Sequence, residues 1–136
     1  MKILKNKAIL LIAFLVTITT FSQEYEESQK INYKTGNPAN WPANLDAVRA
    51  ARNNHKILLE NDQVRVLEVY LAPEEKEPLH HHKWPSVLYI QEAGDFVDYD
   101  SNDKVIFDTQ KLPEPLSFPL TMTKEPEAPH SVVNLS

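Results

Sequence analysis

Histidine is the residue type in this chain best suited to metal chemistry, and three of its five histidines are adjacent. His80, His81 and His82 follow one another directly. In an extended strand side chains alternate between faces, so His80 and His82 would share one side and His81 would take the other. Two imidazoles about 7 Å apart along a strand can converge on one ion. The pair therefore predicts half of a metal site.

A third ligand must come from elsewhere in the chain, and we expect it to be His130. This residue also follows a proline-rich turn and precedes an apolar stretch. Three neutral imidazoles leave coordination positions open for water, substrate or dioxygen. We therefore predict one divalent ion, which could be iron, manganese, nickel or zinc. The alternative is that the adjacent histidines lie in an exposed polar loop. His55 and His81 have no partner at a useful spacing, so we interpret both as structural residues.

The elements that position these histidines must be short. The chain has ten prolines and two glycines, and proline is confined to turns and strand edges because it lacks a backbone donor. This pattern argues against a helical bundle and for many short strands. We expect strands at 56–59, 64–71, 86–91, 105–107, 117–123 and 131–135. The stretch 64–71 is apolar on both faces, which predicts burial, and 100–103 is typical of a polar turn.

The start of the chain has the pattern of a secretory signal peptide. Three lysines precede an apolar run at 8–16, and small and polar residues follow it. We predict cleavage after Ser22 and export to the periplasm or the extracellular space. The apolar run is shorter than the roughly 20 residues of a membrane span, so we expect no stable span after cleavage. An uncleaved anchor is the alternative.

Residues 23–136 are enough for one domain and too few for two. We expect a polar arm over 23–44, with Trp41 as its anchor, followed by a domain over 45–136. A short helix at 45–52, capped by Asn44, would open that domain. Loss of residues 1–22 removes three lysines and no acids, so 11 basic residues face 19 acidic ones and the net charge moves from −5 to −8. So acidic a chain repels phosphate, which excludes nucleic acid as the expected partner.

The histidines and their flanks resemble the two motifs of the cupin superfamily. The first motif spans 74–94, with His80 and His82 in its paired positions and Gly94 at its closing turn. The second motif ends in a histidine followed by an asparagine, as in His130 to Asn134. The resemblance covers residues 55–136 and is strongest to small single-domain cupins with the stretch His-x-His-x-Trp-Pro-Ser-Val-Leu-Tyr. It implies an all-β double-stranded β-helix, or jelly-roll barrel, with a short N-terminal helix and arm.

The chain departs from the cupin pattern at the metal carboxylate. Val87 occupies that position, and Glu92 is the alternative carboxylate, five residues further on. The three remaining histidines are similar to the ligand set of the thiol dioxygenases of this superfamily. Oxygenase or isomerase chemistry on a small organic molecule is one expected function. A barrel that binds a sugar or metabolite without chemistry is the second, and a structural accessory of the envelope is the third.

Four further residues are candidates for contact with a small molecule. Trp84 follows the histidines and would shape a wall of the barrel mouth. If Val87 points inward, then Tyr89 and Gln91 do so too. The hydroxyl of Tyr89 could act as a general acid, or it could simply be a core group. Arg65 could hold a substrate carboxylate, but we favour a surface pair with Glu68 or Asp62.

The second motif lies close to the end of the chain. Cupin barrels continue for at least one strand after this motif, whereas here two residues follow Asn134. Either the sequence is a fragment, or the arm or a second subunit covers the missing edge. Because an open edge tends to pair with another chain, we expect a homodimer.

Overall fold

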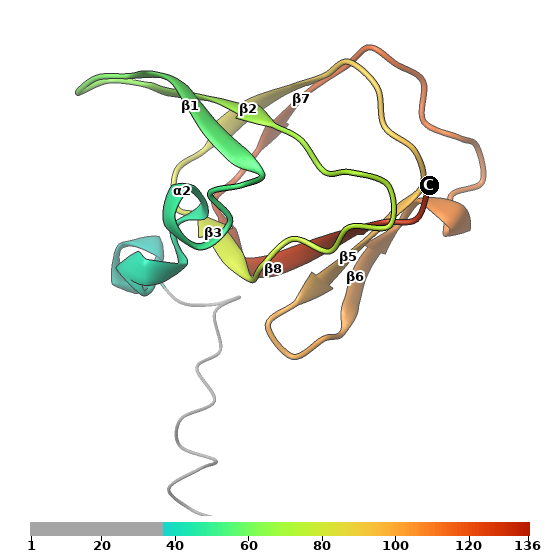
Figure 1. Ribbon diagram of the computed structural model, residues 1–136, viewed down its shortest axis with the longest axis horizontal. Coiled ribbons are helices and arrows are strands. Elements are labelled where there is room, and N and C mark those ends of the chain that lie inside the picture. The colour runs from blue at the N-terminus through green and yellow to red at the C-terminus, as the bar shows by residue number, and fades with distance from the viewer. Residues whose placement is uncertain (1–36) are drawn as a thin grey trace, which may run out of the picture. The chain divides into compact units, whose positions relative to one another are not determined.

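The computed structural model describes residues 37–136, and this part of the chain is predominantly β (Figure 1). The predicted signal peptide and most of the predicted arm lie outside the described residues. The strands are β1 (His55–Glu60), β2 (Arg65–Val69), β3 (His80–His82), β4 (Ser86–Ile90), β5 (Phe96–Asp100), β6 (Val105–Asp108), β7 (Leu120–Lys124) and β8 (Glu127–Asn134). The helical segments are η1 (Pro38–Asn40), η2 (Ala43–Leu45), α2 (Ala47–Ala50) and η3 (Thr109–Lys111). The predicted all-β class is therefore confirmed.

The strands pair into three antiparallel sheets within residues 37–136. Four strands form a sheet in the order β3-β8-β5-β6, while β1-β2 and β4-β7 are two-stranded. These pairings do not close into a single barrel in this part of the chain, so the jelly-roll closure stays a prediction. No helix among residues 37–136 is long and apolar enough to cross a membrane.

Strand β8 is the element on which the candidate site depends, because it lies between β3 and β5 (Figure 1). Across β3 and β8, His80 lies opposite His130 and His82 lies opposite Glu127. Between these two pairs β3 advances by two residues and β8 by three, which is a β-bulge. Pro129 is buried within this irregular stretch, where its missing N–H is tolerated.

The N-terminal helix is shorter than predicted and begins later. Asp46, not Asn44, is its cap, and its side chain accepts a hydrogen bond from the Val48 amide at 3.3 Å. The preceding segment packs onto the four-stranded sheet through Trp41, which is buried, with its ring 5.4 Å from the ring of His81. The expected anchoring role of Trp41 therefore holds for the described end of the arm.

Two predictions about the strands need correction. The stretch 64–71 forms β2, but it is not buried: Val69 is 58% exposed and the adjoining Tyr70 is 66% exposed. Strand β5 of the four-stranded sheet was not predicted from the sequence. The polar turn between β5 and β6 is as expected, because the Asp100 side chain accepts hydrogen bonds from the amides of Asn102 and Lys104.

Candidate metal centre

Four histidines from three strands gather at one end of the four-stranded sheet. The Nε2 atoms of His80 and His82 are 3.2 Å apart. The ring of His130 lies 4.7 Å from that of His80 and 5.8 Å from that of His82. The rings of the three predicted ligands, His80 and His82 from β3 and His130 from β8, thus lie near one another, but His80 and His130 belong to different groups of ligand atoms, which share His82. Both His80 and His130 are buried.

His55 belongs to the same cluster, which corrects its interpretation as an isolated structural residue. Its ring lies 4.6 Å from His80 and 5.1 Å from His82. Ligand atoms of His55, His80 and His82 all lie within 4.8 Å of one another. His55 opens β1 directly after the helical turn α2, which contacts both β1 and β3. Its partners therefore come from another sheet, and no local spacing in the sequence indicates them.

The backbone and one carboxylate fix the tautomers of three of these imidazoles. The Nδ1 atom of His55 lies 3.2 Å from the Ala51 carbonyl, and that of His80 lies 2.9 Å from the Pro78 carbonyl. A carbonyl only accepts, so each Nδ1 must donate. His130 donates from Nδ1 to Asp98 Oδ1 at 3.0 Å. In all three, the lone pair is consequently on Nε2, the arrangement found in metal-ligating histidines.

The spacing of the two β3 imidazoles suits neighbouring ligands of a single ion. Metal–nitrogen bonds of about 2.1 Å at angles between octahedral and tetrahedral separate two nitrogens by about 3.0–3.4 Å, and the observed separation is 3.2 Å. Without an ion, His82 can donate from Nε2 to the lone pair of His80. A divalent ion would take the place of that proton. Moreover, His130 Nε2 is buried and has no hydrogen-bond partner, so the donor set fits a metal.

Three carboxylates surround the histidines, and the sequence indicated none of them. Asp98 is buried beside His130, and Glu77 is buried with one oxygen 3.8 Å from His80 Nε2. Glu127 on β8 forms a second group with His82 and His130, in which the ligand atoms lie within 4.8 Å of one another. Glu92, the alternative carboxylate considered above, is exposed after β4. The acids at the site thus lie on β5, on β8 and before β3.

Burial dominates the electrostatics of the cluster. Burial, with a smaller contribution from the neighbouring histidines, lowers the pKa of His80 to about 2 and that of His82 to about 4. Burial also raises the pKa of Glu77 to about 7. For His130 burial alone would lower the pKa, but the hydrogen bond to Asp98 and its charge outweigh that effect and raise it. Neutral imidazoles on β3 are ready to ligate at neutral pH.

The residues predicted to contact a small molecule lie mainly on exposed positions. Val87 does not point inward, because its side chain is 71% exposed, and Tyr89 on the same face of β4 is 63% exposed. Gln91 is exposed just beyond that strand. Trp84 is half exposed, and its ring is covered by the guanidinium of Arg65 at 5.2 Å.

Arg65 is paired within the protein, although not with the predicted acids. Its Nη1 donates to Asp46 Oδ1 at 3.0 Å and its Nε donates to Glu60 Oε1 at 2.6 Å. Glu68 instead pairs with Lys56. The guanidinium therefore already has carboxylate partners, which leaves less of it for a substrate.

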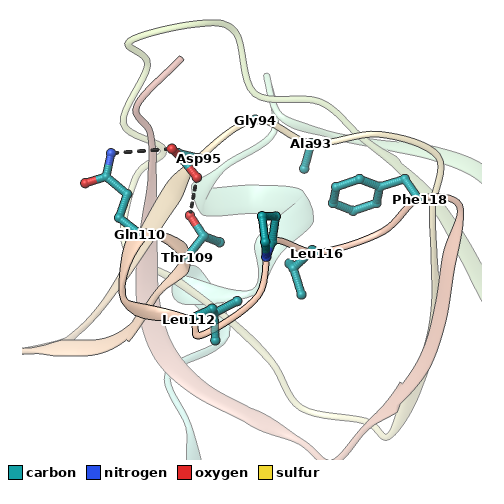
Figure 2. Close-up of a pocket in the computed structure, with 9 residues that line it drawn as sticks. Ala93, Gly94, Asp95, Thr109, Gln110, Leu112, Leu116 and Phe118 are labelled. Atoms are coloured by element: carbon teal, nitrogen blue, oxygen red, sulfur yellow. Dashed lines mark hydrogen bonds between the residues drawn. The ribbon is translucent and has the colours of Figure 1, made fainter.

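A surface pocket lies away from the histidines (Figure 2). Its lining comes from the loop before β5 and from the segment that follows β6, and it contains no histidine. The labelled residues are Ala93, Gly94, Asp95, Thr109, Gln110, Leu112, Leu116 and Phe118. Thr109 and Gln110 donate to the Asp95 carboxylate across its rim. With that carboxylate occupied and no second titratable group there, the pocket offers less chemistry than the histidine cluster.

Comparison with known proteins identifies no relative. No protein-family model, no curated protein sequence and no solved structure matches the chain. The functional argument therefore depends on the geometry of the cluster and on the motifs of the sequence.

Proposed function

We propose that this chain is an exported, cupin-type protein that holds one divalent metal ion among its clustered histidines and uses it to bind or transform a small organic molecule. The observation that carries the proposal is the set of fixed tautomers. His55, His80 and His130 each donate from Nδ1 to a protein acceptor, so each has its Nε2 lone pair available. Export is supported by the amino-terminal sequence pattern, and the cupin assignment by the two motifs.

The chemistry that a bound ion supplies is polarisation of a ligand or activation of dioxygen. The protein's own contribution is to orient the imidazoles. Asp98 holds the ring of His130, and the Pro78 carbonyl holds that of His80. Burial keeps the His80 ring neutral, so that no proton competes with the ion there near neutral pH, whereas the hydrogen bond to Asp98 raises the pKa of His130.

Metal content is the direct test. Elemental analysis of the full chain, purified from its native compartment, should find about one divalent ion per chain. His82→Ala should remove it, because this variant deletes the imidazole that both ligand groups share. His81→Gln is the matched control: His81 donates from Nε2 to the Pro42 carbonyl at 2.9 Å, on the other face of β3. Equal metal content in the protein and in His82→Ala, with both folded by circular dichroism, would refute the site.

One observation favours a role without catalysis. With His55 as a fourth imidazole, the ion could be enclosed by protein ligands, as in structural sites. Turnover separates the two functions: a panel of thiols and hydroxy acids is supplied aerobically to the iron-loaded protein. Substrate consumption above that of His82→Ala supports catalysis. No turnover, together with a large fall in melting temperature on chelation, supports a structural ion.

A further inference from the structure

We propose that Glu127 is a carboxylate ligand of the metal centre, in a facial set with His82 and His130. This inference rests on the proposed function, because it defines the ligand sphere of the same ion. Ligand atoms of these three side chains all lie within 4.8 Å of one another. Two imidazoles and one carboxylate on one face of an ion are the ligand set of non-haem iron(II) oxygenases, with the remaining positions open.

The bulge in β8 makes this set geometrically available. Residues 127 and 130 are three apart, so in a regular strand their side chains would project to opposite faces. The extra residue between the pairs His80–His130 and His82–Glu127 reverses that alternation. Glu127 and His130 can thus reach the same face of the sheet. The two β8 ligands and the β3 histidines are then positioned by a single pair of strands, whereas His55 comes from a separate sheet.

The unsatisfied nitrogen of His130 places the ion on the β8 side of the cluster. Its Nε2 is buried and lacks a hydrogen-bond partner, while its Nδ1 is held by Asp98. Buried polar atoms are seldom left unpaired, because that costs about 1–3 kcal/mol. An ion bound through His130 satisfies this atom. An ion bound only by His55, His80 and His82 leaves it unpaired.

Charge points to the same set. A divalent ion brings two positive charges into a buried site, which is costly unless nearby carboxylates compensate them. Glu127 supplies a negative charge, and it forms an ion pair with Lys124 of β7. The Lys124 side chain is 34% exposed, so its long stem can carry the ammonium into solvent. We infer that the bound ion displaces this ammonium from Glu127.

Manganese(II) tests the assignment, because this hard ion favours carboxylate ligands and the free ion is counted directly by electron paramagnetic resonance. The full chain, Glu127→Gln and Glu125→Gln are titrated with manganese(II) and, by competition, with nickel(II). Glu127→Gln should bind manganese at least about tenfold more weakly, with a smaller loss for nickel, which imidazole suits better. Glu125 is exposed on the same β7–β8 connection, and its variant should bind both ions within twofold of the unaltered chain.

The outcomes separate this inference from the proposed function. If the unaltered chain binds neither ion, the proposed function fails and the inference fails with it. If binding is lost in His82→Ala but unchanged in Glu127→Gln, only the role of Glu127 is overturned. Equal losses for manganese and nickel in Glu127→Gln would also overturn it, because a merely structural residue affects both ions alike. Lys124→Met should bind manganese at least as tightly as the unaltered chain; a loss as large as that of Glu127→Gln would contradict displacement of the ammonium.

Discussion

At the scale of single residues, three of the four clustered imidazoles are oriented by a hydrogen-bond acceptor at Nδ1. Asp98 does this for His130, and backbone carbonyls do it for His55 and His80. The same burial that prepares the imidazoles makes the site unfavourable for protons. The free energy of unfolding of the metal-free protein should therefore depend on pH, and the pKa shifts of the buried groups determine whether it rises or falls.

Acid should destabilise the metal-free protein. Between pH 4.5 and 6.5 the unfolded chain binds protons at His80 and His82 that the folded chain does not, because the folded pKa values are about 2 and 4 against 6.5. Glu77 acts in the opposite sense, since its folded pKa of about 7 lies above 4.5. His55, whose pKa burial also lowers, adds to the effect of His80 and His82, while His130, whose pKa is raised, opposes it. The balance predicts that the free energy of unfolding falls by on the order of 1 kcal/mol per pH unit on acidification.

Urea unfolding of the chelator-treated protein at pH 4.5, 5.5 and 6.5 measures this slope. In His82→Asn one of the three histidines with a lowered pKa is gone, so the slope should flatten. A free energy of unfolding that is constant or increases on acidification of the unaltered chain would contradict the burial of neutral imidazoles.

At the scale of elements, the sequence predicts the strands better than it predicts what they bury. The period-two argument correctly separates His80 and His82 from His81, because it depends only on the strand backbone. It does not predict Glu127, since a regular strand would turn this residue away from His130 and the bulge is a tertiary feature. His55 is missed for a related reason: its partners lie in another sheet. The exposure of β2 was also unexpected. An apolar pattern predicts that a strand is buried, but it does not show which other element packs against that strand.

The docking of the N-terminal segment is a second property of elements, and Trp41 should carry most of it. Its buried ring packs against His81, on the face of β3 opposite the cluster. Trp41→Ala should lower the free energy of unfolding by about 3 kcal/mol, measured by urea unfolding, and leave the metal content unchanged. Trp84→Ala is the matched control, because Trp84 is half exposed and its contact with the Arg65 guanidinium is worth about 0.5–1 kcal/mol. Equal losses in the two variants would show that Trp41 is not the anchor.

At the scale of the whole molecule, residues 37–136 leave much apolar surface on the two-stranded sheets. A β-bulge lies between Ile57 and Leu59, which pair with the adjacent residues Leu67 and Val66 and so lie on opposite faces of the hairpin. Ile57, Leu58 and Leu59 are all at least 42% exposed. Within the described residues β1 and β2 pair only with each other, and Figure 1 shows their hairpin reaching away from the four-stranded sheet. A two-stranded hairpin is marginal on its own. Apolar residues on both of its faces indicate that something covers it.

We propose that the cover is a second copy of this chain, in a homodimer. Among residues 37–136 neither edge of the β1–β2 sheet pairs with another strand, so its backbone groups can pair with a second chain, and the two faces offer apolar area for an interface. Multi-angle light scattering after size-exclusion chromatography should give twice the chain mass.

Leu58→Lys should shift the protein toward the monomer, because a lysine ammonium is costly to bury in an apolar interface. Gln63→Lys adds the same side chain at the exposed turn of the hairpin and should leave the dimer intact. A monomer at all concentrations of the unaltered chain would refute the dimer. Equal dissociation by both lysines would point to net charge instead of the apolar face of β1.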